Sequence, residues 1–235
     1  MAYYSSGNSL QRQSPVVLNL IIINVLVWLA QHFITQVNIT EWGALHYYKS
    51  AAFGPHQLVT NIFMHDPRGL THILFNMFSL YIFGSILERF WGSKRFIIFY
   101  LICGIGASII LELSIPYSAQ LSVEHMAKAQ NFVGDLTSSI ELYKQQYSAL
   151  GASGAIMGLM AAFAYLFPNT ELYVMFIPVP VKAKYVIPVL VLIDLFGGFY
   201  HIEGDDIGHF AHLGGALIGI IIVLLWNKTN RKTFY

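Results

Sequence analysis

The chain has 235 residues, of which 56% are hydrophobic and only 11% charged, and its formal net charge is +1. Soluble domains carry about 25% charged residues, so this composition excludes an ordinary soluble domain and predicts an all-α protein that crosses the membrane several times. The small net charge gives no indication of nucleic-acid binding. The single cysteine, Cys103, excludes an intramolecular disulfide and is expected to be a small core residue.

Six apolar segments are candidates for membrane-spanning helices, since a full crossing takes about 20 apolar residues. In chain order they are Val16–Ile34, Leu70–Leu87, Phe96–Leu113, Ser153–Phe167, Tyr185–Phe199 and Phe210–Trp226. The first is too long for a signal-peptide core and is expected to be an uncleaved span. The fourth and fifth are short, so we expect them inside a bundle. We predict one membrane domain over residues 1–235, with residues 1–14 and 227–235 as short polar ends.

Two of the predicted connections are long. Residues 35–69 are rich in aromatic side chains and are expected to lie in the membrane interface. Residues 114–150 form a polar insertion in which apolar side chains recur at loosely helical spacing. This pattern predicts one or two short amphipathic helices packed on the outer surface, with a break near Gly134.

The basic residues predict the orientation of the spans. With six spans both termini lie on one side, and nine of the 13 basic residues fall on that side. They are Arg12, Arg89, Lys94, Arg95, Lys182, Lys184, Lys228, Arg231 and Lys232, against Lys49, Arg68, Lys128 and Lys144 on the other. Because cytoplasmic loops carry the excess of Lys and Arg, both termini are expected in the cytoplasm.

Polar residues lie near the starts of the three spans that begin at the outer face. His72 and Asn76 are four residues apart on one helix face, Ser153 opens the fourth span, and His212 lies near the start of the sixth. Each has an ordinary structural interpretation, as a packing serine, an interhelical amide or a satisfied core histidine. Their shared depth on three helices instead favours a polar site within the membrane, where such groups are costly.

Glycines around these residues favour close helix contact. They are Gly151, Gly154 and Gly158 in the fourth span region, and Gly215 and Gly219 in the sixth. Small residues four apart let two helices approach closely in lipid. Such an approach would bring Ser153 within hydrogen-bond reach of His212, the arrangement that activates a serine nucleophile.

Other intramembrane chemistries fit the sequence less well. A zinc peptidase would need an H-E-x-x-H motif, which the chain lacks. A metal held by His65, His72, His209 and His212 has no carboxylate at ligand spacing, so no metal or cofactor is expected. An aspartyl mechanism needs two intramembrane carboxylates, and only Asp194 is deep in a span. We expect Asp194 to be hydrogen-bonded within the bundle, with a role in gating as the alternative.

Several motifs, taken in order, resemble the rhomboid family of intramembrane serine peptidases over most of the chain. They are Gln57-Leu58-Val59-Thr60, Phe63-Met64-His65, His72-x-x-x-Asn76-Met77, Gly84-x-x-x-Glu88, Gly151-Ala152-Ser153-Gly154-Ala155-x-x-Gly158 and Ala211-His212-Leu213-Gly214-Gly215. The resemblance implies a six-helix rhomboid bundle. The chain departs from the best-known bacterial pattern in its long loop before the serine, in Gly43 after Trp42, and in Met157 where some members have a tyrosine.

The resemblance also implies roles. Ser153 would be the nucleophile, His212 the general base, and His72, Asn76 and the Ser153 backbone N–H the oxyanion donors. No carboxylate is evident to orient His212, so a Ser-His dyad is expected. Substrates would be single-span or other membrane proteins in the lipid bilayer, and the location a bacterial inner membrane with the site open to the outer side.

The fifth span and residues 200–209 are candidates for a lateral gate and lid, with Gly197-Gly198 as hinge. One rival function is a catalytically inactive rhomboid-like protein that binds membrane clients. Another is a small transporter, which the absence of recognisable repeats disfavours.

Overall fold

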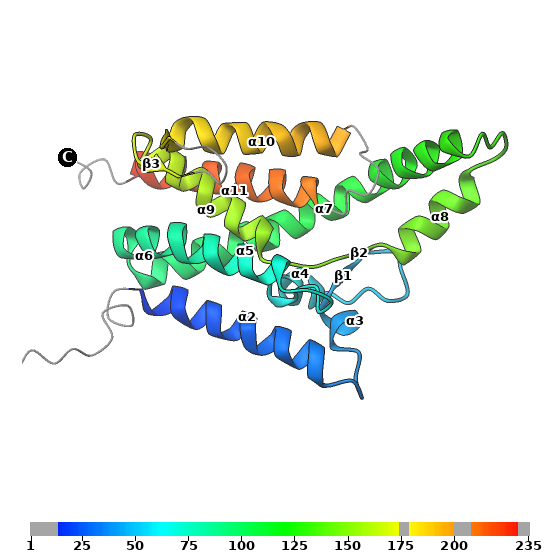
Figure 1. Ribbon diagram of the computed structural model, residues 1–235, viewed down its shortest axis with the longest axis horizontal. Coiled ribbons are helices and arrows are strands. Elements are labelled where there is room, and N and C mark those ends of the chain that lie inside the picture. Colours follow the sequence, from blue (N-terminus) through cyan, green and yellow to red (C-terminus); the bar gives the residue numbers. More distant parts are fainter. Residues whose placement is uncertain (1–13, 174–178, 200–207, 230–235) are drawn as a thin grey trace, which may run out of the picture.

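The computed structural model describes residues 14–173, 179–199 and 208–229. Long helices run side by side along one axis and form a bundle (Figure 1). The long apolar helices are α2 (Pro15–Phe33), a continuous run Thr71–Trp91, α7 (Ser93–Ala129), α9 (Ser153–Leu166), α10 (Ala183–Phe199) and α11 (His209–Thr229). The run Thr71–Trp91 consists of α5 (Thr71–Ser79), a π-helical turn η2 (Leu80–Gly84) and α6 (Ser85–Trp91). The protein is therefore an all-α polytopic membrane bundle.

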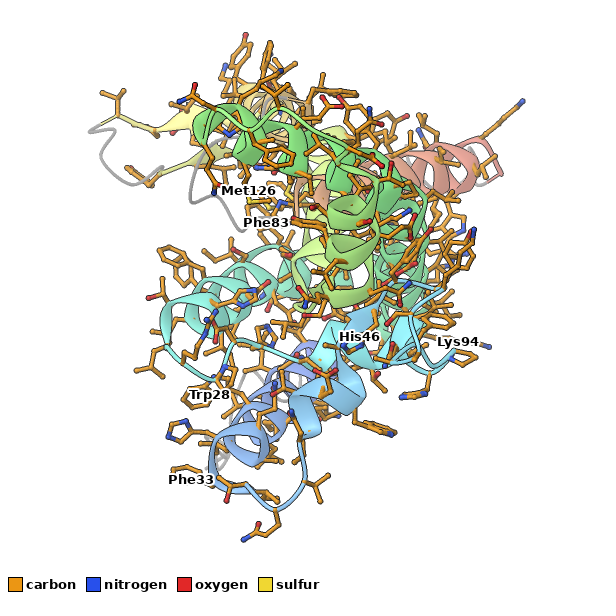
Figure 2. The ribbon with its side chains drawn as sticks, turned by 90° about the vertical axis from the view of Figure 1, so that its right-hand side faces the viewer. Trp28, Phe33, His46, Phe83, Lys94 and Met126 are labelled. Atoms are coloured by element: carbon orange, nitrogen blue, oxygen red, sulfur yellow. The ribbon has the colours of Figure 1, made fainter. Side chains whose placement is uncertain are left out.

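The six predicted spans agree with these helices, with one exception at the end of the third. Four of the helical runs are long and apolar enough to cross a membrane, and α9 and α10 are shorter, with 14 and 17 residues. The short helix α9 lies within the bundle, and most of its side chains are buried. At the periphery, α2 exposes many apolar side chains, such as Phe33 at its end, as expected of a surface that faces lipid (Figure 2).

The third helix does not end near Leu113 as predicted. α7 continues through Pro116 to Ala129, a total of 37 residues, and only residues 130–136 separate it from α8 (Thr137–Gln146). In its outer half, Ile115, Ala119 and Val123 recur at helical spacing and are buried. This apolar stripe lets α8 pack on α7, and the packing stabilises the helix beyond the proline. The predicted insertion is thus a helical arm that projects from the bundle (Figure 1).

The segment between α2 and α5 contains only short elements. These are α3 (Ile39–Gly43), β1 (Leu45–His46), α4 (Gln57–Thr60) and a 3-10 turn η1 (Asn61–Phe63). β1 pairs antiparallel with β2 (Ser148–Ala149), which immediately precedes the turn into α9. A second two-residue pair joins β3 (Glu171–Leu172) to β4 (Val181–Lys182) between α9 and α10. The β1–β2 pair therefore joins the segment between α2 and α5 to the segment that leads into α9.

A buried carboxylate fixes the start of α2. Glu88, at 2% exposure, accepts hydrogen bonds from the backbone N–H groups of Val16 and Val17 at 3.0 and 2.8 Å, and from Ser93 Oγ at 2.6 Å. These amides belong to the first turn of a helix and have no partner within it. Glu88 therefore joins α2, α6 and α7 at the end of the bundle remote from Ser153.

Glycines set the spacing of α9 and α11. A Cβ atom on Gly215 would overlap the carbonyl oxygen of Gly154, and one on Gly158 would lie 2.9 Å from the carbonyl oxygen of Gly215. A Cβ on Gly219 would likewise lie 2.5 Å from the Gly158 oxygen. The two backbones are in direct contact over about two turns, as small residues in membrane helices permit. No larger residue fits these positions without separating the helices.

Candidate active site

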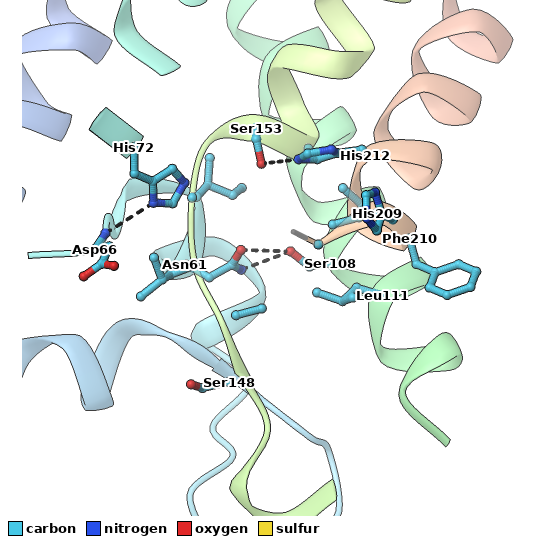
Figure 3. Close-up of a pocket in the computed structure, with 18 of the residues that line it drawn as sticks. Asn61, Asp66, His72, Ser108, Leu111, Ser148, Ser153, His209, Phe210 and His212 are labelled. Carbon is cyan, nitrogen blue, oxygen red and sulfur yellow. Dashed lines mark hydrogen bonds between the residues drawn. The ribbon is translucent and has the colours of Figure 1, made fainter. Parts of the chain in front are cut away.

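Ser153 and His212 lie next to each other at the N-terminal ends of α9 and α11. Ser153 Oγ is 2.8 Å from His212 Nε2 (Figure 3). Ser153 is the first residue of α9, and His212 lies in the first turn of α11. The glycine contacts one turn further along bring the two helix starts this close. An imidazole nitrogen at this distance can accept the hydroxyl proton of the serine.

A carboxylate orients His212, contrary to the sequence-based expectation. Asp194 Oδ1 lies 2.9 Å from His212 Nδ1 and 2.8 Å from the Nδ1 atom of His209. Asp194 comes from α10 and is only 7% exposed. A carboxylate accepts hydrogen bonds, so the contact favours the tautomer of the neutral His212 ring that has its proton on Nδ1 and its acceptor nitrogen, Nε2, towards Ser153. Ser153, His212 and Asp194 are therefore linked in line by two hydrogen bonds, whereas the sequence analysis linked only the serine and the histidine.

The turn before the serine requires glycine. Gly151 has φ +130, a backbone conformation that residues with a side chain rarely adopt. Its N–H donates to the carbonyl oxygen of Asn61 at 2.9 Å, and a Cβ atom at this position would lie 2.9 Å from His72 Nε2. The missing side chain leaves room for the imidazole of His72 beside the serine turn. Gly151 thus acts through backbone geometry rather than helix packing.

His72 presents one ring nitrogen to this turn. Its Nδ1 accepts a hydrogen bond from the backbone N–H of Asp66 at 3.4 Å, so the proton of the neutral ring is on Nε2. The Nε2–H group is a donor on the side of Gly151 and Ser153. The first backbone N–H groups of α9 add further donors there, because they have no partner within the helix.

Asn76 lines the same cavity as His72 and Ser153. Its Nδ2 donates to the carbonyl oxygen of His72 at 2.9 Å, four residues earlier in the helix. One amide hydrogen is used in this bond, and an amide group has two. The four polar residues singled out from the sequence therefore all line one cavity. Ser153 and His212 are in direct contact, and His72 and Asn76 line the same cavity from α5.

The cavity has a volume of about 1650 Å³ and reaches from this site to the arm. Two residues that the sequence interpretation did not single out form its floor. Asn61 Nδ2 donates to Ser108 Oγ at 3.0 Å, and Ser108 Oγ donates to the carbonyl oxygen of Gly104 (Figure 3). Ser108 lies on α7, next to the small residues Gly104 and Ala107. A polar side chain among small residues in an apolar segment is the sequence feature that could have identified it as a cavity residue. The polar floor makes the cavity suitable for water.

Part of the predicted gate lies outside the described residues, namely positions 200–207. The described part of α10 exposes most of its apolar side chains and buries only Ala183, Ile187, Asp194 and Gly198. Near its end, Phe199 packs against Phe210 of α11 and Tyr117 of α7, with ring centroids 5.8 Å apart in both pairs. A Cβ atom on Gly197 would overlap the ring of His209, so the glycine pair also admits the second histidine.

In the part of the chain that the structure describes, no group of three or more His, Cys, Asp or Glu side chains is arranged so that it could hold a metal ion. The rings of His65 and His72 are 5.1 Å apart, and those of His209 and His212 both face Asp194. The four histidines considered as ligands thus form two separate pairs.

The fold and this site together define a polytopic membrane protein in which a serine and a histidine in hydrogen-bond contact line a polar cavity. The family profile of the Rhomboid domain matches residues 53–228. The chain belongs to the rhomboid family.

Relatives include plant organelle and bacterial proteins. RHOMBOID-like protein 12, mitochondrial, of Arabidopsis thaliana is 31% identical over 225 residues, which cover 93% of this chain and 60% of that protein. Rhomboid protease AarA of Providencia stuartii is 26% identical over 234 residues, 92% of this chain and 73% of the relative. Rhomboid protease GluP of Bacillus subtilis is 29% identical over 164 residues, 69% of this chain and 24% of the relative. The chain therefore spans less than two thirds of the length of RHOMBOID-like protein 12 and of GluP.

Proposed function

We propose that this protein is an intramembrane serine endopeptidase that cleaves membrane-anchored protein substrates in or near their membrane-spanning segments. The observation that carries the proposal is the 2.8 Å contact between Ser153 Oγ and His212 Nε2 at a polar cavity inside an apolar bundle. Membership of a family that includes the proteases AarA and GluP supports it.

In this reaction Ser153 attacks the peptide carbonyl while His212 Nε2 takes the hydroxyl proton. The imidazolium then gives that proton to the leaving amine, and water hydrolyses the acyl-enzyme by the same path in reverse. Asp194 stabilises the imidazolium through its bond to Nδ1 and holds the ring in the required tautomer. His72 Nε2–H, the free amide hydrogen of Asn76 and the Ser153 N–H stabilise the oxyanion.

Substrate and water reach the site from different directions. Water enters through the cavity above Ser108 and Asn61, whereas a membrane-spanning substrate enters from the lipid side. We assign the lateral gate to α10, because this helix faces lipid over most of its length. The excess of basic residues on the terminal side supports an orientation with both termini in the cytoplasm and the cavity mouth outside. With relatives in bacteria and in organelles, a bacterial inner membrane is the location we propose.

Labelling by a fluorophosphonate probe tests the chemistry without knowledge of the substrate. The wild-type protein in liposomes should react, and Ser153→Ala and His212→Ala should each lose most labelling and all cleavage, because nucleophile and base act as a unit. Thermal unfolding of each variant shows whether it is folded. Labelling of folded Ser153→Ala at the wild-type rate would refute the assignment. A wild-type protein that neither labels nor cleaves a panel of single-span substrates would favour the inactive client-binding alternative.

A further inference from the structure

The floor of the active-site cavity continues onto the helical arm along one face of α7. Lining residues recur on this helix at intervals of three, four and seven, which is the spacing of a single helix face. Near the serine the lining residues are Gly104, Ala107, Ser108 and Leu111, and on the arm they are Ser118, Leu121 and Ser122. The cavity is therefore not limited to the surroundings of Ser153. It continues along α7 as a groove that reaches the arm.

The opposite wall of this groove comes from α8 and the chain that follows it. Tyr143, Gln146 and Tyr147 line the same cavity as Ser118 and Ser122. Hydrogen bonds hold this wall in place, since Ser50 Oγ donates to the carbonyl oxygen of Gln145, and β2 pairs with β1 directly after it. From α8 the chain runs through β2 to α9, whose first residue is Ser153 (Figure 1).

The outer half of α7 is held to the rest of the protein as well. Glu112 Oε2 accepts a hydrogen bond from the backbone N–H of Tyr48 at 2.9 Å, and Glu112 is 7% exposed. The bond fixes the helix where it leaves the bundle. A groove between two supported walls needs little ordering when a chain binds in it, which favours affinity.

The length of the groove matches a short extended peptide. Ala107 marks the level of the serine, because a Cβ atom on Gly154 would lie 2.6 Å from Ala107 Cβ. From Ala107 to Ser122 the helix rises by about 22 Å at 1.5 Å per residue. An extended chain covers that distance with about six or seven residues at 3.3 Å each.

The groove walls on the arm are polar but uncharged. Besides Leu121, the residues that line the groove on the arm carry hydroxyl groups or, in Gln146, an amide group. The nearby Lys144 is paired with Glu141 and does not line the cavity. Hydroxyls and amides can bond to peptide N–H and C=O groups, whereas a charged side chain would lose water and gain no counter-charge.

We propose that the arm is a substrate-binding exosite that holds about six uncharged residues of the substrate's extramembrane segment, on the outer side of the scissile bond. This proposal rests on the proposed function, because the peptide must continue to Ser153. It assigns substrate selection to the α7 extension and α8.

Peptide-extended probes test the exosite directly. A short alkyl fluorophosphonate serves as the bare probe. Two further probes carry a hexapeptide of Ala, Ser and Gln, joined through its carboxyl end in one and its amino end in the other, and matched versions of both carry Glu. The rate constant for labelling Ser153 is measured on the full chain in liposomes. At least one uncharged extension should raise it about tenfold, equivalent to 1.4 kcal/mol, and its Glu version should not.

Two tryptophan substitutions on α7 separate a groove effect from a general effect of bulk. Ser118→Trp fills the groove and should remove the acceleration, which is measured as the ratio of the extended-probe to the bare-probe rate constant in the same variant. Gln120→Trp, at an exposed position on the opposite face, should retain the acceleration. Equal rates for bare and extended probes, or acceleration that persists in Ser118→Trp, would overturn the exosite. Failure of the bare probe to label Ser153 at all would instead overturn the proposed function.

Discussion

Asp194→Asn and Asp194→Ala probe the carboxylate whose bond to His212 the sequence did not predict. Asp194 Oδ1 accepts hydrogen bonds from the Nδ1 atoms of His212 and His209, at 2.9 and 2.8 Å. In the proposed reaction His212 becomes positively charged after it takes the serine proton. An asparagine can keep the oxygen acceptor but not the negative charge, whereas an alanine removes both. The two variants should therefore lower kcat by different amounts.

The size of each effect follows from the strength of the bond. A hydrogen bond to a charged group contributes about 1.5–3 kcal/mol, and one between neutral groups about 0.5–1.5 kcal/mol. The asparagine variant should thus lose about 1.5 kcal/mol, or about tenfold in kcat. The alanine variant loses the whole interaction and the control of the tautomer, about 2–3 kcal/mol or roughly 100-fold. KM should change little, since Asp194 contacts the histidines and not the substrate.

The assay is cleavage of a single-span substrate in liposomes, with kcat calculated per folded molecule. Glu88→Gln is the matched control, because it also changes a buried carboxylate, but one that binds the backbone of α2 at the remote end of the bundle. It should lower the melting temperature and leave kcat per folded molecule within about twofold. If folded Asp194→Ala keeps the wild-type kcat, the carboxylate has no part in catalysis and the reasoning fails.

Three further predictions concern the surroundings of the site. His72→Ala and Asn76→Ala should each lower kcat, by about 3 kcal/mol or less, while the nucleophile still labels; a lower melting temperature with an unchanged rate would point to structure alone. Gly215→Val should abolish both labelling and cleavage, because its side chain would overlap a carbonyl oxygen of α9 and push the two helices apart; full activity in this variant would contradict the role of the glycine contact. Burial, together with the unfavourable electrostatic effect of the nearby His72 imidazole on a second positive charge, lowers the pKa of His65 to about 4. The unfolded chain therefore binds the extra proton first, and the melting temperature should fall as the pH decreases from about 6.5 towards 4. His65→Gln should flatten that dependence, and a profile identical to wild type would refute the assignment.

The sequence predicted the spans and the serine–histidine pair because both depend on local patterns. Apolar runs of the necessary length have few alternatives to membrane helices. The contact between Ser153 and His212 follows from glycines that recur every four residues, and this spacing determines which helix faces meet. The observed helix starts, at Ser153 and His209, are within a residue of those predicted.

Features that depend on contacts between distant segments could not be predicted in this way. Pro116 and the polar residues after it indicate the end of a helix, yet packing against α8 carries α7 on to Ala129. Asp194 lies on a different helix from its partners, and no sequence spacing relates positions in neighbouring helices unless their rotation is known. The same applies to Asn61, whose contact with Ser108 joins segments 47 residues apart.

In the proposed reaction, the position of Asp194 on α10 would link the orientation of His212 to the opening of the proposed lateral gate. This helix is fixed by few buried side chains, and one of them is the carboxylate that orients His212. An outward swing of α10 large enough to admit a substrate helix would carry Asp194 away, and the histidine would lose its fixed tautomer. The protein would thus be inactive while α10 is in the open position, and each catalytic cycle would begin only after α10 had returned to the bundle with the substrate bound. Membrane proteins that contact α10 only briefly would then not be cleaved.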